Sequence, residues 1–81
     1  MPMVDVVCEI RRAGYTADGK AILDMRSAGT FDWNWFLSTP EHGREILAIG
    51  MTAIVANKMI ECQIVDPVGP YSQVDAAFLV K

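Results

Sequence analysis

Hydrophobic and polar residues alternate with a period of two at the start of the chain. Val4, Val6, Cys8 and Ile10 alternate with Asp5, Val7, Glu9 and Arg11. This period is typical of a strand that places one face in a core. It predicts a strand over Met3–Ala13 with the side chain of Cys8 inside.

Two further short strands are predicted before the middle of the chain. Asp18 and Gly19 form a strong turn signal, because both residue types accept positive φ. The run Ala21–Arg26 follows this turn, and a second turn separates it from the run Thr30–Phe36. The first three strands are therefore expected to form a meander.

The pattern then changes to that of a helix. Ser38 followed three residues later by Glu41 has the spacing of a capping box, and Pro40 suits a first helical turn. Asn57 tolerates the left-handed conformation that often ends a helix. These signals predict a single helix over about residues 39–57.

This helix has an unusually wide apolar surface. At about 100° per residue, its polar and small side chains form one narrow stripe of Glu41, Glu45, Ala48, Thr52 and Ala56. The remaining arc is apolar and contains Ile46, Leu47, Ile49, Gly50, Met51, Ala53, Ile54 and Val55. A single buried face needs only roughly 100° of the circumference, so one neighbour cannot cover this arc.

Two strands, Met59–Val65 and Ser72–Val80, are predicted after the helix, with a break over Asp66–Pro70. The order is β-β-β-α-β-β in a single domain over residues 1–81. Five short antiparallel strands bury their apolar faces best in a small OB-like barrel with the helix at one opening. An open α+β sheet with the helix on one face is the alternative.

The composition indicates that the protein either assembles with other chains or binds a ligand. A chain of 81 residues has a thin core, yet 52% of its residues are hydrophobic. More apolar surface than one core can bury indicates an oligomer interface, or failing that a ligand groove. Self-association is therefore the first expectation.

Charge excludes some partners. The net charge is −3, and Arg11 and Arg12 are the only adjacent basic pair, which argues against nucleic acid as a partner.

The apolar run Ile46–Ala56 is too short for a membrane span of about 18 residues or more. The start of the chain lacks the pattern of a secretory signal, which favours the cytoplasm unless a signal was removed.

Residues that could carry catalysis are few. His42 is the single histidine, and Cys8 and Cys62 stand far from metal-binding spacing, so no metal, cofactor or catalytic residue is predicted. The thiols are expected to be buried and free, with a disulfide as the alternative. A Cys8–His42 nucleophile pair is disfavoured, because Cys8 is expected to face the core.

The aromatic residues before the helix are the main binding signal. Trp33 and Trp35 share one strand face, with Asp32 and Asn34 nearby, and Tyr71 in the last hairpin is a further candidate. An aromatic plane matches the apolar face of a sugar, and short polar side chains match its hydroxyls. Burial in the core or in a subunit interface is the alternative role for both tryptophans.

Several of these features together resemble the small B subunits of bacterial A-B toxins, the Shiga toxin B subunit above all. The similar features are a first strand that ends near Tyr15 and an acidic turn, a short hairpin, a Trp just before an apolar helix, and a closing Ser-x-Val strand. They extend from Val7 to Leu79.

This resemblance implies a homopentameric ring of OB-like barrels, with helices around a central pore and strands of adjacent subunits paired. It also implies binding of cell-surface carbohydrate, with Trp35 as a sugar platform. The helix pattern fits a ring independently. Its expected pore and subunit-contact residues are Glu41, Glu45, Thr52, Ile46, Ile49 and Ala53.

Two functions remain open from the sequence. The first is a non-enzymatic, ring-forming module that binds carbohydrate or another small polar ligand. The second is a cytoplasmic structural or adaptor protein, such as a mobile gene-cassette product, whose apolar helix associates with itself or with a protein partner.

Overall fold

The predicted strands and the predicted helix are all present in the computed structural model, which describes residues 3–66 and 68–80. The elements are β1 (Met3–Tyr15), β2 (Ala21–Ser27), β3 (Phe31–Ser38), a 3-10 turn η1 (Pro40–His42), α1 (Gly43–Ala56), β4 (Ile60–Val65) and β5 (Gln73–Leu79). The predicted fold, a small and mainly β barrel with the order β-β-β-α-β-β, is confirmed. Pro67, in the predicted break before β5, lies outside the described residues.

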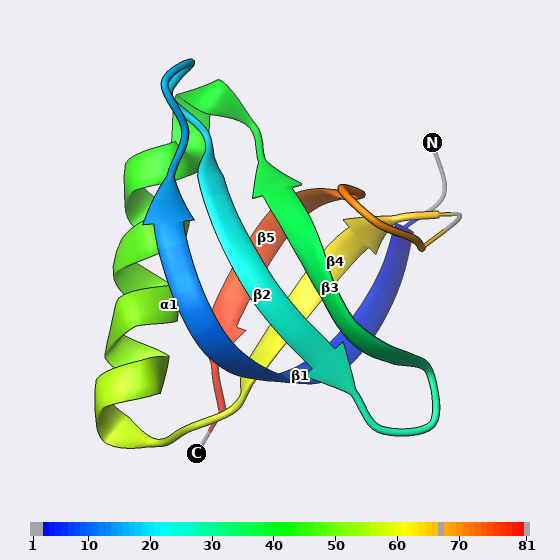
Figure 1. The fold of residues 1–81 in the computed structure, drawn as a ribbon. Coiled ribbons are helices and arrows are strands. Elements are labelled where there is room, and N and C mark those ends of the chain that lie inside the picture. The colour runs from blue at the N-terminus through cyan, green and yellow to red at the C-terminus, as the bar shows by residue number, and fades with distance from the viewer. Residues whose placement is uncertain (1–2, 67, 81) are drawn as a thin grey trace.

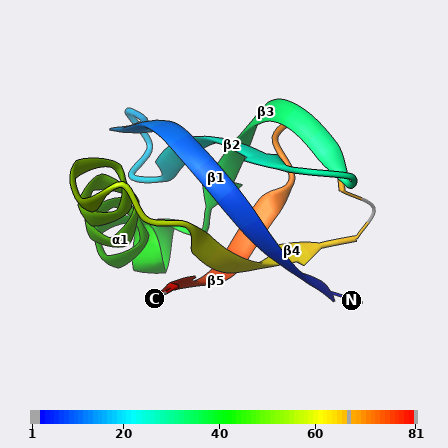
Figure 2. The same cartoon turned by 90° about the horizontal axis from the view of Figure 1, so that it is seen from below.

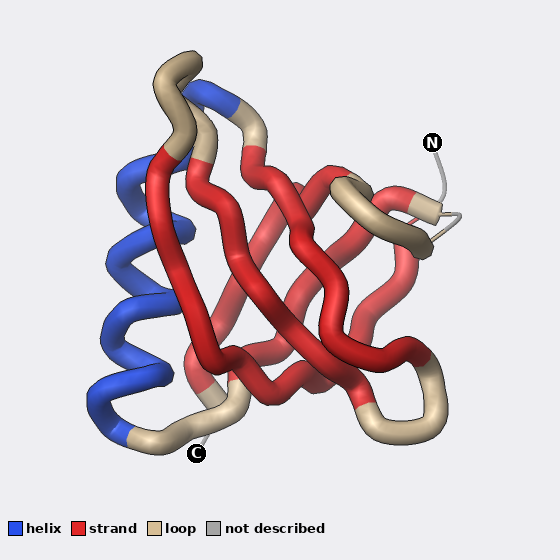
Figure 3. Tube along the Cα trace, viewed as in Figure 1, coloured by secondary structure: helices blue, strands red, loops and turns tan. Residues whose placement is uncertain are grey.

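The strands close into a barrel in the order β1-β2-β3-β5-β4 (Figures 1 and 3). The long strand β1 makes this closure possible, because it pairs with β4 through Met3–Cys8 and with β2 through Glu9–Tyr15. The barrel is completed between β3 and β5, which pair in parallel at two positions, Leu37↔Gln73 and Ser38↔Val74. The prediction of antiparallel strands throughout was therefore wrong at this closure.

The barrel interior holds the apolar residues that alternate along the strands. The buried side chains are Val6, Cys8, Ala21, Leu23, Met25, Phe36, Ile46, Ala53, Ile60, Cys62, Ile64, Val74 and Ala77. Cys8 faces the core as predicted, and both cysteines are free thiols. A hydrogen bond shared with Cys8, together with burial, raises the pKa of the Cys62 thiol, which is therefore protonated at neutral pH.

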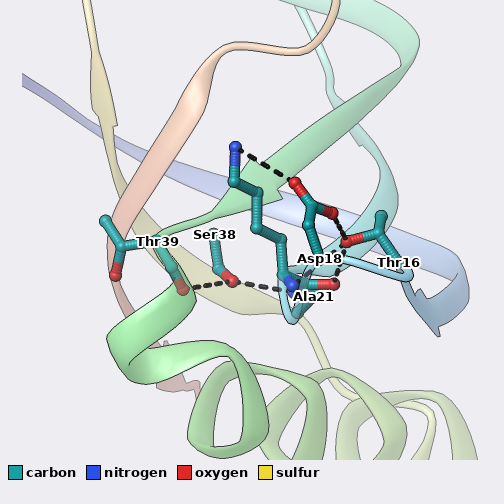
Figure 4. A network of polar contacts seen from close by, with 6 residues as sticks. Thr16, Asp18, Ala21, Ser38 and Thr39 are labelled. Atoms are coloured by element: carbon teal, nitrogen blue, oxygen red, sulfur yellow. Dashed lines mark hydrogen bonds and ion pairs between the residues drawn. The ribbon is translucent and has the colours of Figure 1, made fainter.

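The helix begins later than the sequence predicts. Ser38 belongs to β3, where its Oγ accepts a hydrogen bond from the Ala21 amide at 2.8 Å and donates one to the Thr39 carbonyl at 3.0 Å (Figure 4). The Ser38 hydroxyl therefore joins the β1–β2 turn to the end of β3 and does not cap a helix. The predicted end is confirmed, since Asn57 adopts the left-handed conformation at φ 55°.

The turn between β1 and β2 is closed by side chains as well as by its backbone. The Thr16 hydroxyl donates to Asp18 Oδ1 at 2.5 Å (Figure 4). It also accepts from the Lys20 amide at 3.1 Å. The Thr16 hydrogen bond holds the pKa of Asp18 below its ordinary value. Gly19 supplies the positive φ, at 87°, that the sequence signal predicts.

Helix α1 lies at one end of the barrel and contacts β1, β2, β4 and β5 (Figures 1 and 2). Four of its residues face the barrel and are buried: Gly43, Ile46, Gly50 and Ala53. The predicted polar stripe, from Glu41 to Ala56, is exposed. Apolar side chains are also exposed, with Val55 accessible over 87% of its surface.

Candidate functional site

A β-bulge in β1 places two arginines on the same outer surface of the barrel. The register between β1 and β2 shifts between Ile10 and Arg12, so that Arg11 is an extra residue in β1. Such a bulge interrupts the alternation of side chains between the two faces of a strand. Arg11 and Arg12 consequently both extend over the outer face of β2.

Asp24 of β2 binds both arginines. Its Oδ2 atom accepts hydrogen bonds from Arg11 Nε at 2.6 Å and from Arg12 Nε at 2.9 Å, and the Asp24 side chain is only 2% exposed. The arginine side chains are 50% and 59% exposed, respectively. One carboxylate faces two guanidinium groups, so one positive charge at this surface is not compensated by Asp24.

Each arginine also stacks on a tryptophan of β3. The guanidinium of Arg11 lies 4.4 Å from the ring centroid of Trp33, and that of Arg12 lies 4.5 Å from the ring centroid of Trp35. These distances are within the range of cation–π attraction. Arg26 adds a second contact to Trp33 at 5.2 Å and pairs with Glu9 at 2.5 Å.

Beside this surface, the space between the barrel and the helix forms a groove of about 500 Å³. Its walls are largely apolar, with two guanidinium groups and one indole among them. We call it the α1–β1 groove; it is lined by Arg11, Arg12, Ala13, Gly14, Ile22 and Trp35 of the barrel and by Met51, Ile54 and Val55 of the helix. Its volume is in the range of small-molecule sites in proteins.

Comparison with models of known families, with curated proteins and with solved structures finds no match. The resemblance to toxin B subunits therefore stays a prediction, and the function has to be argued from the geometry of this chain.

The predicted ligand-binding residues do not all meet at one place. Trp33 and Trp35 are half-buried on the outer face, and Trp35 lines the groove. Asn34 lies on the opposite face of β3, and the Asp32 carboxylate accepts a hydrogen bond from the Trp33 amide at 2.8 Å. Tyr71 is exposed, and its amide donates to the Trp35 carbonyl at 2.6 Å, so it lies in the loop beside the same strand.

The residues predicted to form a pore and subunit contacts divide into two groups. Glu41, Glu45 and Thr52 are exposed, as a surface role requires. Ile46 and Ala53 are buried within the chain itself, at 4% and 1% exposure, which leaves little of either side chain for a contact between copies. Ile49 is half-buried and packs against the core.

Residues capable of nucleophilic or metal chemistry are not brought together. Cys8 is enclosed in the barrel, whereas His42 is exposed on η1, where its Nδ1 contacts Glu45 at 3.0 Å. Among residues 3–66 and 68–80, no three His, Cys, Asp or Glu side chains are grouped to hold a metal ion. In the same residues, no helix has the length and apolar character needed to cross a membrane.

Sequence reasoning missed Asp24 and the paired role of the two arginines. Asp24 interrupts the apolar run from Ile22 to Met25, and a carboxylate in such a run needs a partner. The Arg11–Arg12 pair lies on the other strand of the same hairpin. These two arginines were therefore the residues that the sequence offered as partners for the Asp24 carboxylate. Only the bulge, which the sequence does not mark, places both arginines over Asp24.

Proposed function

We propose that the protein is a non-enzymatic binding module that holds a small ligand in the α1–β1 groove and assembles with copies of itself. The observation that carries the ligand part is the groove, which combines apolar walls with two exposed guanidinium groups and one indole. Apolar walls with a few directed polar groups are what small-molecule sites generally offer.

Carbohydrate remains one candidate ligand for this site, with Trp35 as the aromatic wall. Arg12 already lies over the Trp35 ring at 4.5 Å, so a sugar would meet guanidinium donors at this wall as well as the indole. Nucleic acid is not favoured, because Asp24 and Glu9 already pair with the three arginines of this surface. Little positive charge remains to neutralise a chain of phosphates.

We expect intrinsic tryptophan fluorescence to change when the protein is titrated with a suitable small ligand, because Trp35 lines the groove. The panel would contain neutral sugars, sugar acids, amphipathic acids and amphipathic amines. In the variant Gly14→Val, the new side chain enters the groove beside Ile22 and should weaken binding by about tenfold or more.

The matched control is Gly69→Val, because a side chain at Gly69 meets no atom within 4 Å and this loop does not line the groove. Gly69→Val should bind as the wild type does. A panel in which no compound alters the fluorescence or the melting temperature would exclude the ligand part of the proposal.

A separate observation supports self-assembly. Because β3 pairs with β5 at two positions, the edge of β5 that faces β3 has no strand partner over Asp75–Leu79 within the described part of the chain. The same stretch exposes Phe78, at 54%, and Leu79. A strand edge without a strand partner, next to exposed apolar side chains, can pair with a strand of another chain. The resemblance to toxin B subunits implies such pairing in a ring of five.

We expect light scattering after gel filtration to give a mass several times that of the chain, five times in the case of the ring. Phe78→Glu should shift the protein toward the monomer, because it places a charge at the proposed contact. Ala28→Glu, in the exposed β2–β3 turn, introduces the same charge elsewhere and should leave the mass unchanged. A monomeric wild type at high concentration would exclude the assembly.

These experiments also distinguish the ligand-binding module from the alternative, the adaptor hypothesis. It predicts a mass that depends on Phe78 together with a groove that binds no member of the ligand panel.

A further inference from the structure

We infer that the ligand of the α1–β1 groove is an amphipathic monoanion, with a carboxylate held by Arg11 and Arg12 and an apolar body between β1 and α1. This inference rests on the proposed binding function and names the class of ligand. Its first basis is charge: Asp24 is the carboxylate that pairs with both arginines, which leaves one positive charge at the groove. One further carboxylate would complete the balance.

Both arginines also have N–H donors that their contacts with Asp24 do not use. A guanidinium carries five N–H donors, whereas Arg11 uses Nε and Arg12 uses Nε and one terminal nitrogen in their contacts to Asp24. Both side chains are at least half exposed, so their other donors can reach a ligand. Paired N–H donors in a plane match the two oxygens of a carboxylate.

The arginines are positioned before any ligand arrives. Asp24 holds each guanidinium by a hydrogen bond. The guanidinium of Arg11 also stacks on the indole of Trp33, and that of Arg12 stacks on the indole of Trp35. Side chains held in this way lose less conformational entropy on binding than free arginines would. The arrangement therefore suits a defined anionic group better than diffuse attraction of any negative charge.

The rest of the groove requires an apolar body on the ligand. Met51, Ile54 and Val55 line the helix side, and Ile22 lines the barrel side. Among the lining residues, the two arginines on the β1 side are the ones with charged side chains. A small anion such as phosphate would leave these walls exposed to water, whereas an alkyl or aryl chain would cover them.

The test uses the wild-type protein and three ligands with the same chain: octanoate, 1-octanol and octylammonium. Calorimetry should give at least about tenfold tighter binding for octanoate than for the other two, because a charged hydrogen bond is lost in each of them. In the series butanoate, hexanoate and octanoate, affinity should rise by about fourfold for each added methylene.

Arg12→Met keeps the apolar stem and removes the charge, so octanoate should bind about tenfold more weakly and 1-octanol should bind as before. Arg26→Met is the matched control, since Arg26 also stacks on an indole but does not line the groove. It should bind octanoate as the wild type does. If Arg12→Met does not fold, the head-group and chain-length series in the wild type still decide the question.

The outcomes are distinguishable. Equal binding of octanoate and octylammonium, or tight binding of phosphate or of a single-stranded oligonucleotide, would overturn the inference. Binding of a neutral sugar in the groove with no preference for the carboxylate would overturn it and leave the proposed function standing. If no compound binds, both are excluded.

Discussion

Gly43→Ala is expected to destabilise the protein by about 3 kcal/mol, toward the upper end of the effects of overpacking. Gly43 begins α1 and packs directly against the β1–β2 turn. A methyl group at this position would overlap the carbonyl oxygen of Gly19 and lie 3.3 Å from the Ala21 amide nitrogen. Both are backbone atoms, which cannot move aside as a flexible side chain could.

The clash should outweigh the intrinsic preference of helices for alanine, which is worth only about 1 kcal/mol over glycine. Urea unfolding monitored by circular dichroism gives the difference in free energy. Thermal unfolding should show a melting temperature lowered by more than about 10 °C, as expected for a domain of this size. Gly69→Ala is the control, because it meets no neighbour and should leave stability nearly unchanged. A Gly43→Ala protein as stable as this control would show that close packing of Gly43 against the β1–β2 turn does not contribute to stability.

A second contact with the start of β2 explains why the start of the helix was harder to predict than its end. The left-handed Asn57 is a local feature that the residue type favours, and the sequence located it correctly. Ser38 and Glu41 have the spacing of a cap, yet the hydroxyl of Ser38 is taken by the amide of Ala21, 17 residues earlier. That long-range hydrogen bond outweighs the local signal, and nothing near Ser38 in the chain reveals it.

The barrel was predictable because most of its strands carry a period of two, which fixes the inward faces and hence the core. The candidate site was only partly predictable, because it depends on an interruption of that period. Strict alternation places Arg11 outside and Arg12 inside, and a single bulge returns both to the outer surface. Trp35 was identified from the sequence, but its arginine partner comes from a strand two positions away in the sheet.

Asp24→Asn should destabilise the protein by about 2 kcal/mol and should also loosen the arginines of the groove. Removing one partner from a fully buried ion pair costs about 3–5 kcal/mol. Here Asp24 is buried but both arginines are about half exposed, so solvent screening places the effect below that range. Asparagine keeps the shape of the side chain and one acceptor oxygen, but it removes the charge and replaces the other oxygen with an NH2 donor.

A double-mutant cycle separates the ion pair from other consequences of the substitution. Asp24→Asn, Arg12→Met and the double variant are compared by urea unfolding, and the double variant should be less destabilised than the sum of the two single variants. The coupling should shrink in high salt, since half-exposed charges are screened. Simple additivity would mean that Asp24 is held by Arg11 alone. Arg12 would then carry the charge that Asp24 does not neutralise, without being fixed by Asp24, and octanoate affinity should still fall in Arg12→Met.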